Sequence, residues 1–321
     1  MDIPAVDLGF FPTPVHSLPR LSRMLGGAEI WIKRDDQTGL ATGGNKTRKL
    51  RLLVADAIAQ GADTLITGGA IQSNHARQTA AAAAQWGLEC HLVLRGRPPQ
   101  VPTGNLLLDH LLGAHIHWVE SKEAMHAALP QVADELRQQG KAPYVIPYGG
   151  SNALGATAYA LAVEELLKQT PNLTFDAIVF ASSSGGTQAG LVTGARIFGL
   201  DAEIVGISVD EPAPVLRERV AKLASGVGEL LEVDVGISPQ DVQVEDRFIG
   251  GGYAVVGELE REAIRLLART EGVLLDPVYT GRAFGGLLTL LREGRWERGQ
   301  RVLFWHTGGI AGLFAFAREL M

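Results

Sequence analysis

The chain contains a single cysteine, Cys90, among its 321 residues. A lone cysteine excludes an internal disulfide and a zinc site built from several thiolates, and it suits a reducing cytoplasm. The histidines show none of the spacings typical of a metal site, so no bound metal is expected. Cys90 lies in the apolar stretch "CHLVL", where we expect it to serve packing alone.

Basic charge and long apolar runs are also scarce. Lysine and arginine total 29 against 35 acidic residues, which gives a net charge of −6. A basic surface for nucleic-acid phosphates is therefore not expected. No apolar run approaches the roughly 20 residues that cross a bilayer, and the N-terminal "MDIPAVDLGFFPTP" lacks the features of a signal peptide. These features predict a cytoplasmic protein without membrane contact.

Strands and helices alternate in the first half of the chain. Apolar runs separated by helical patterns predict four strands, at 64–67, 90–94, 115–119 and 143–147. Strands joined by helices pair in parallel through right-handed crossovers. These residues therefore predict an α/β unit with a parallel sheet.

The alternation resumes after residue 150, with strands expected at 176–181, 203–209 and 301–306. An earlier strand, 29–33, precedes the first helix and needs a partner. The economical hypothesis joins residues 1–48 and 151–321 in one large domain, and makes 49–150 a smaller inserted domain. The fold class is α/β, with two open parallel-sheet domains.

Lys46 is the first residue that could carry chemistry. In "GGNKTRKL" it follows two glycines and Asn45, at the expected start of a helix. An aldehyde cofactor needs an amine that is held in place and partly desolvated, and flexible glycines let the backbone approach a flat ring. The alternative is that "KTRK" is only the solvated basic face of a helix.

A second candidate is "ASSSGGTQAG", residues 181–190, which follows an apolar strand and opens a helix. Parallel sheets bind ligands at this position, and a helix N-terminus with small residues and hydroxyls favours an anion. The segment matches neither GxGxxG nor GxxxxGK[ST], so a dinucleotide or a nucleoside triphosphate is disfavoured. A single phosphate monoester held by neutral donors fits best, and a tight turn without a ligand is the alternative.

A third candidate is "GGAIQSNHARQ", residues 68–78, again between a strand and a helix. Its polar side chains at a helix N-terminus suit a carboxylate, and Ser73 can also act as a plain N-cap. His75 could be a base, but a histidine in a first helical turn is more often a bystander. Near the C-terminus, "LLDPVYTG" places Tyr279 and Thr280 at a turn after an apolar strand, and "HTGG" places Thr307 before a glycine bend.

Together these motifs resemble those of one family. The segments "IKRDD", "GGNKTRKL", "GAIQSNH", "GGSNALG", "SSGGT", "LLDPVYTG" and "HTGG" are similar to those of the D-cysteine desulfhydrase and 1-aminocyclopropane-1-carboxylate deaminase family. The resemblance runs from about residue 10 to residue 315. It implies pyridoxal 5'-phosphate as the cofactor and the fold of the tryptophan synthase β-subunit, with the cofactor in the cleft between two domains. It also implies a homodimer.

The resemblance assigns the cofactor-binding residues. It makes Lys46 the catalytic lysine that bonds covalently to the cofactor aldehyde, and it places Asn45 near the pyridoxal ring. Thr280 and Thr307 fall where the pyridine nitrogen is bound. The phosphate loop comprises Ser182, Ser184, Gly185, Gly186 and Thr187.

The resemblance also assigns the substrate side of the site. Ser73 can relay a proton, and Tyr253 and Tyr279 line the substrate face of the ring, with Tyr279 taking part in catalysis. The segment that binds the substrate carboxylate comprises Gln72, Ser73 and Asn74.

Thr280 distinguishes the activities within this family. The cyclopropane deaminases have "VYE" where this chain has "VYT". A carboxylate keeps the pyridine nitrogen protonated and the ring a strong electron sink, whereas a hydroxyl brings no opposing charge. A weaker sink suits β-elimination, so we expect a lyase that converts D-cysteine to pyruvate, ammonia and hydrogen sulfide.

Three alternatives remain open. L-Cysteate could lose sulfite in the same way, although no pair of arginines is evidently placed for a sulfonate; Arg77 and Arg282 are near the proposed loops. Cyclopropane deamination is disfavoured by Thr280. A protein that binds the cofactor without catalysis is disfavoured by Lys46, because phosphate binding alone needs no such amine.

Overall fold

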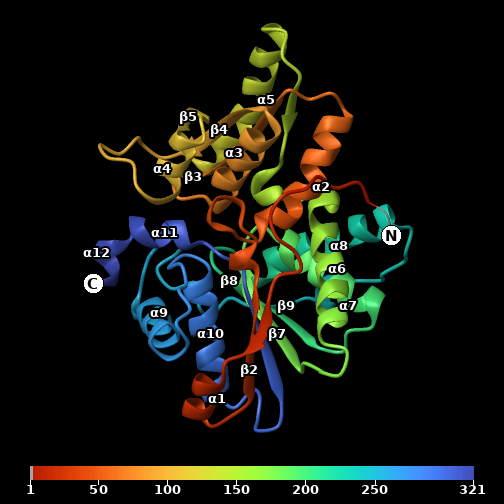
Figure 1. Cartoon of the computed structure of the whole chain (residues 1–321), viewed down its shortest axis with the longest axis vertical. Coiled ribbons are helices and arrows are strands. Elements are labelled where there is room, and N and C mark those ends of the chain that lie inside the picture. Colours follow the sequence, from red (N-terminus) through yellow and green to blue (C-terminus); the bar gives the residue numbers. More distant parts are fainter. Residues whose placement is uncertain (1–2) are drawn as a thin grey trace.

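The structure is a computed structural model that describes residues 3–321. It contains two sheets with helices on both faces (Figure 1). The larger sheet has the order β1-β2-β10-β7-β8-β9, and its strands are parallel except for the antiparallel pair β1–β2. Its strands are β1 (Val15–Ser17), β2 (Glu29–Arg34), β7 (Ala177–Ser182), β8 (Glu203–Ser208), β9 (Gln243–Glu245) and β10 (Arg301–His306).

The smaller sheet is entirely parallel and has the order β5-β4-β3-β6. It comprises β3 (Thr64–Ala70), β4 (Glu89–Arg95), β5 (His115–Val119) and β6 (Pro143–Val145). The four strands expected between residues 64 and 147 are therefore confirmed, with their parallel pairing. The early strand that needed a partner is β2, which pairs with β10.

The helices follow the strands in the order that parallel crossovers require. Those nearest the smaller sheet are α2 (Lys46–Ala59), α3 (Asn74–Trp86), α4 (Gly104–Leu111) and α5 (Lys122–Gln138). Those around the larger sheet are α1 (Pro19–Leu25), α6 (Ala153–Gln169), α7 (Gly186–Phe198), α8 (Ala213–Leu231), α9 (Glu258–Glu271), α10 (Thr280–Arg292), α11 (Ile310–Ala315) and α12 (Ala317–Leu320).

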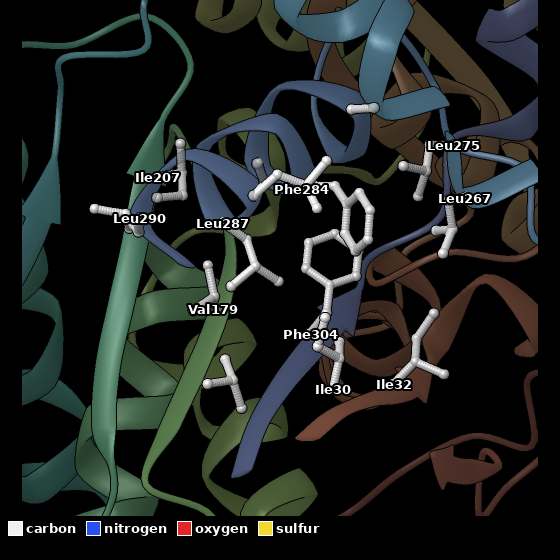
Figure 2. Packing of buried hydrophobic residues seen from close by; sticks show 14 of the residues in the cluster. Ile30, Ile32, Val179, Ile207, Leu267, Leu275, Phe284, Leu287, Leu290 and Phe304 are labelled. Atoms are coloured by element: carbon white, nitrogen blue, oxygen red, sulfur yellow. The ribbon is translucent and has the colours of Figure 1, made fainter. Parts of the chain in front are cut away.

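Both faces of the larger sheet are buried, because successive side chains of each strand point in opposite directions. On β7, Val179 joins the core beneath α9 and α10, whereas Ile178 and Phe180 pack with α6 and α7. Figure 2 shows the first of these cores, where Phe284 of α10 meets Phe304 of β10 edge to face, with ring centroids 5.0 Å apart. Continuous apolar strands are typical of a parallel sheet covered on both sides.

One expectation for the C-terminal part was wrong, and a helix there was not predicted. The segment before Tyr279 forms no strand, and α10, which was not predicted, begins at Thr280. The reason is local: the carboxylate of Asp276 accepts hydrogen bonds from the backbone N–H groups of Val278, Tyr279 and Thr280. A carboxylate that takes up these free N–H groups starts a helix.

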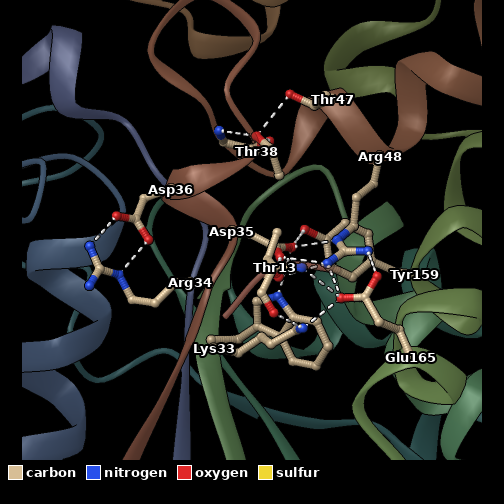
Figure 3. A network of polar contacts seen from close by, with 12 residues as sticks. Thr13, Lys33, Arg34, Asp35, Asp36, Thr38, Thr47, Arg48, Tyr159 and Glu165 are labelled. Atoms are coloured by element: carbon tan, nitrogen blue, oxygen red, sulfur yellow. Dashed lines mark hydrogen bonds and ion pairs between the residues drawn. The ribbon is translucent and has the colours of Figure 1, made fainter. Parts of the chain in front are cut away.

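A buried ionic network joins the N-terminal segment to helices and to strands (Figure 3). The carboxylate of Asp35 lies at its centre and is fully buried. Arg48 of α2 donates to both of its oxygens at 2.8 Å, and Thr13, Tyr159 of α6 and Trp305 of β10 donate at 2.6–2.8 Å. Because Arg48 is the third residue of α2, the network fixes the start of that helix.

The charges in this network balance. Glu165 of α6 accepts hydrogen bonds from Arg48 and from Lys33 of β2. Burial alone would raise the pKa of Asp35, but Arg48, Lys33 and the Tyr159 hydroxyl together outweigh it and lower the pKa to about 2. A buried charge with a full set of partners is tolerated, whereas one that loses its partner is strongly destabilising.

We expect Asp35→Asn to lower the free energy of unfolding by about 3–5 kcal/mol, because it leaves the Arg48 guanidinium short of its main buried counterion. The control is Asp134→Asn, which removes an exposed pair with Arg137 and should cost less than about 1 kcal/mol. Since the folded pKa of Asp35 lies below the unfolded value, its stabilisation is present above about pH 4 and is lost between about pH 4 and 2. Urea unfolding at several pH values measures both effects, and equal losses in the two variants would contradict the assignment.

Candidate functional site

A cavity lies where the carboxyl ends of strands from both sheets meet. Each segment that lines it follows a strand or opens a helix, which is where parallel sheets bind ligands. The lining residues are Asn45, Lys46, Ser73, Asn74, His75, Tyr148, Gly149, Ala181, Ser182, Ser183, Ser184, Gly185, Thr187, Tyr279 and Thr307.

The cavity brings together ten of the residues proposed from the sequence. These are Asn45, Lys46, Ser73, Asn74, Ser182, Ser184, Gly185, Thr187, Tyr279 and Thr307. Gln72, Gly186, Tyr253 and Thr280 do not line it. Three of them adjoin a lining residue in the sequence, and the hydroxyl of Tyr253 lies 2.5 Å from that of Tyr279.

Lys46 is the first residue of α2 and is partly buried. The preceding glycines are required by their backbone and by close contacts. Gly43 and Gly44 have φ of 71° and 130°. A Cβ on Gly43 would lie 2.0 Å from Asp36 O, and a Cβ on Gly44 would lie 2.4 Å from Gln78 Nε2. Burial lowers the pKa of Lys46 to about 8. The amine can therefore be neutral near physiological pH, as a nucleophile or a base must be.

The loop between β7 and α7 presents small residues and hydroxyls. Ser182 Oγ is buried and has no hydrogen-bond partner among residues 3–321, although it borders the cavity. Ser184 Oγ lies 2.8 Å from Ser151 Oγ, and Thr187 Oγ1 accepts a hydrogen bond from Asn45 Nδ2 at 3.0 Å. Together with the N-terminus of the 13-residue helix α7, these donors suit an anion.

A second lysine, Lys49, lies beside this loop and was not predicted to have a role. It is fully buried, and its Nζ is 3.2 Å from both Gly149 O and Ser151 Oγ. A Cβ on Gly186 would lie 2.8 Å from Lys49 Nζ, so the amine lies against the start of α7. The sequence spacing could have indicated a role for Lys49. Residues three apart share a helix face, so Lys49 lies on the same face as Lys46.

The segment between β3 and α3 forms another wall. Ser73 is the N-cap of α3, accepting a hydrogen bond from Ala76 N at 3.1 Å. Gln72 instead turns toward α4, where its Nε2 donates to Thr103 O and its Oε1 accepts from Asn105 N. Of the three polar residues proposed for this segment, Ser73 and Asn74 therefore line the cavity and Gln72 does not.

His75 also lines the cavity, contrary to its treatment as a bystander. Its Nε2 lies 2.9 Å from the hydroxyl of Thr67. Burial and the nearby amines of Lys46 and Lys49 hold the pKa of His75 well below its usual value. The imidazole is therefore neutral at physiological pH.

Two tyrosines lie at the opposite wall. The hydroxyls of Tyr253 and Tyr279 are 2.5 Å apart, and only Tyr279 lines the cavity. Arg95, at the end of β4, has its guanidinium carbon 5.2 Å from the centroid of the Tyr253 ring. Burial raises the pKa of both tyrosines, so both hydroxyls keep their protons.

The two threonines proposed for the pyridine nitrogen are placed differently. Thr307 lines the cavity, whereas Thr280 is fully buried and its hydroxyl donates to Asp276 Oδ1 at 2.7 Å. No aspartate or glutamate is among the lining residues, within the part of the chain that the structure describes. Neutral groups and the Lys46 amine therefore make up the polar surface of the cavity.

Two further properties bear on the kind of site. Residues 3–321 contain no group of three or more histidine, cysteine, aspartate or glutamate side chains that could hold a metal ion. Over the same residues, none of the helices combines the length and hydropathy needed to span a bilayer.

Comparison with known proteins decides the family. Residues 6–308 match the family model described as pyridoxal-phosphate dependent enzyme. The chain belongs to this family. A D-cysteine desulfhydrase from Salmonella choleraesuis is 43% identical over 98% of the chain and 96% of the relative. A Pyrococcus horikoshii protein provisionally named a 1-aminocyclopropane-1-carboxylate deaminase is 42% identical over 99% of the chain and 95% of that protein.

Solved structures agree with this membership. The structure of an ACC deaminase homologue superposes with a TM-score of 0.92 at 41% identity, covering 99% of the chain and 95% of that protein. A hydrogen sulfide-producing enzyme from Fusobacterium nucleatum shares the fold, with a TM-score of 0.69 at 17% identity over 93% and 96% of the two chains. The predicted family, the α/β fold of this class and the pyridoxal-phosphate cofactor are confirmed, as is the prediction of a lyase.

The cavity of this chain fits that cofactor. It holds a desolvated amine for an aldehyde, an unpartnered buried hydroxyl and a helix N-terminus for a phosphate, and small lining residues such as Gly149 and Ala181 that leave room for a flat ring.

We expect Lys46 to titrate near pH 8 in the cofactor-free protein, because desolvation disfavours its charged form. Competitive acylation across pH 6–11, followed by peptide mass analysis, measures the reactivity of each lysine. Lys168, whose side chain is 70% exposed, serves as the internal standard. A Lys46 profile that rises only near the ordinary value of 10.5 would contradict the assignment.

Proposed function

We propose that the chain catalyses β-elimination on a small amino acid, with D-cysteine as the first candidate substrate. The reaction consumes D-cysteine and water and releases pyruvate, ammonia and hydrogen sulfide. The observation that carries the proposal is the absence of carboxylates from the lining residues that the structure describes.

The cofactor would be held by residues from both sheets. Lys46 supplies the amine for its aldehyde, and Asn45 and Thr307 border the same space. Lys49 Nζ lies against the start of α7, beside the loop that lines the cavity, and suits the phosphate. The phosphate donors would come from Ser182, Ser184, Gly185, Gly186 and Thr187.

When bound, pyridoxal phosphate withdraws electrons from the α-carbon of an attached amino acid and so makes its proton acidic. Lys46 is the base for that proton, because its amine has a pKa of about 8 and lines the cavity. Ser73 and Asn74 provide donors for the substrate carboxylate. Tyr279, which keeps its proton and hydrogen-bonds Tyr253, can donate a proton to a departing sulfur.

The neutral lining favours elimination over opening of a cyclopropane. A carboxylate beside the pyridine nitrogen would keep it protonated and strengthen the electron sink. In this cavity the nitrogen would meet hydroxyls such as that of Thr307, because Thr280 is occupied by Asp276 behind the wall. A weaker sink suffices when a leaving group takes up the electrons.

L-Cysteate is the second candidate, and Arg95 favours it. Arg77 and Arg282 are buried and hydrogen-bonded to internal groups, so neither is free for a sulfonate. Arg95 has no ion-pair partner within residues 3–321 and lies against Tyr253, close to the substrate-side wall. A guanidinium at this position could attract an anionic leaving group. We expect a cytoplasmic homodimer, on the grounds of the single cysteine and the family resemblance.

A substrate panel tests the proposal. The purified enzyme is assayed with D-cysteine, L-cysteine, β-chloro-D-alanine, L-cysteate, D-serine and 1-aminocyclopropane-1-carboxylate, and pyruvate and 2-oxobutyrate are quantified separately. We expect pyruvate from D-cysteine and β-chloro-D-alanine, and none from the Lys46→Ala variant. Turnover of the cyclopropane to 2-oxobutyrate without pyruvate from any β-substituted amino acid would overturn it.

We expect Lys49→Gln to weaken binding of pyridoxal phosphate about 10- to 100-fold, because a charge-assisted hydrogen bond to the phosphate is lost. Pyridoxal, which lacks the phosphate, is the matched control ligand, and its affinity should be unchanged. Equilibrium titration by absorbance measures both. Equal weakening for the two ligands would place Lys49 away from the phosphate.

A further inference from the structure

Arg77 is a fully buried arginine on α3, one helical turn after Asn74. Within residues 3–321 its guanidinium donates to amide oxygens alone, and its Nε has no hydrogen-bond partner. Nη1 donates to Asn74 Oδ1 at 3.1 Å and to Asn105 Oδ1 at 2.5 Å, and Nη2 donates to Gly43 O at 2.8 Å. Asp109 and Asp276 are near enough to affect its pKa, but neither accepts a hydrogen bond from it. A buried ion pair therefore does not account for this arginine.

The first consequence concerns the orientation of Asn74. A guanidinium has donors and no acceptor, so the group that faces it must be the oxygen of the Asn74 carboxamide. Asn105 Nδ2 donates to the same oxygen at 3.0 Å. With its oxygen fixed by two donors, Asn74 directs its NH₂ group the other way, and Asn74 lines the cavity.

The second consequence concerns the lysine hinge. The carbonyl of Gly43 accepts hydrogen bonds from Arg77 Nη2 and from Gln78 Nε2, both at 2.8 Å. Gly43 has φ 71° and ψ −179°, outside the helix that begins three residues later at Lys46. One side chain thus holds both the loop that carries Asn74 and the backbone that leads into Lys46.

We infer that Arg77 is a positioning residue that turns the NH₂ group of Asn74 toward the substrate carboxylate and holds the hinge before Lys46. This inference rests on the proposed function only in taking an amino acid as the ligand. The orientation of Asn74 and the fixing of the hinge depend on different groups, so experiments can separate these two effects of Arg77.

The test uses holoenzyme and the unreactive ligand pair alanine and alaninamide, in both enantiomers, with binding followed by the shift of the cofactor absorbance. Arg77→Lys keeps the charge, but it loses the planar fork of donors that reaches the three oxygens. We expect the affinity for alanine to fall about 10- to 100-fold, while that for alaninamide changes less than about twofold. The pH midpoint of the bound cofactor's visible band should rise by about one unit, because a looser hinge admits water around the Lys46 nitrogen.

Asn105→Asp is the second variant. It keeps an acceptor for Arg77 but removes the Nδ2 donor to Asn74, so the preference for alanine over alaninamide should fall while the pH midpoint stays as in the wild type. Arg137→Lys, at an exposed site, is the control and should change neither property. Wild-type ligand preference in both Arg77→Lys and Asn105→Asp would overturn the inference. Alanine lacks a leaving group, so its binding can be measured even if the substrate panel refutes β-elimination.

Discussion

The contact between Asp35 and Arg48 is the constraint on which the site depends. Four side chains besides Asp35, from the N-terminal segment, α2, α6 and β10, converge on one buried carboxylate, and Arg48 lies two residues after Lys46. The helix that carries the amine is thus fixed to the larger sheet at its first turn, while its apolar face packs in the core of the smaller sheet. The backbone position from which the flexible Lys46 side chain extends is thereby fixed, and preorganised catalysis requires such fixed positions.

The cavity combines groups that no single element could provide. Parallel strands place their carboxyl ends at one edge, so loops distant in sequence converge there. Asn45 N donates to Thr307 O at 2.9 Å, and Asn45 Nδ2 donates to Thr187, which links three of these loops directly. Burial then tunes the chemistry. It lowers the pKa of Lys46 to about 8, so part of the amine is neutral near physiological pH, and it raises the pKa values of Tyr253 and Tyr279, so these acids keep their protons.

Much of this was predictable from local sequence. The alternating pattern indicated the four strands of the smaller sheet and β2, β7, β8 and β10 of the larger one, but not the three-residue edge strands β1 and β9. Glycine- and hydroxyl-rich strand ends indicated Lys46, Asn74 and Thr187, because those residue types suit backbone approach and anion binding. Other parts depend on long-range contacts. Whether Thr280 faces the cavity is decided by Asp276, and whether Lys49 is solvated is decided by packing against Ser151. Helix α10 was missed although Phe284, Leu287 and Leu288 recur at helical spacing, and its starting residue is set by the Asp276 carboxylate.

The central claim is that Lys46, rather than its buried neighbour Lys49, is the amine that bonds to the cofactor. Both are desolvated and lie one helical turn apart, but Lys49 is hydrogen-bonded to Gly149 and Ser151 beside the phosphate loop. Borohydride reduction of the cofactor-loaded protein, followed by peptide mapping, distinguishes them directly. The account predicts the added pyridoxyl mass on Lys46 alone. Mass on Lys49, or on neither lysine, would contradict it.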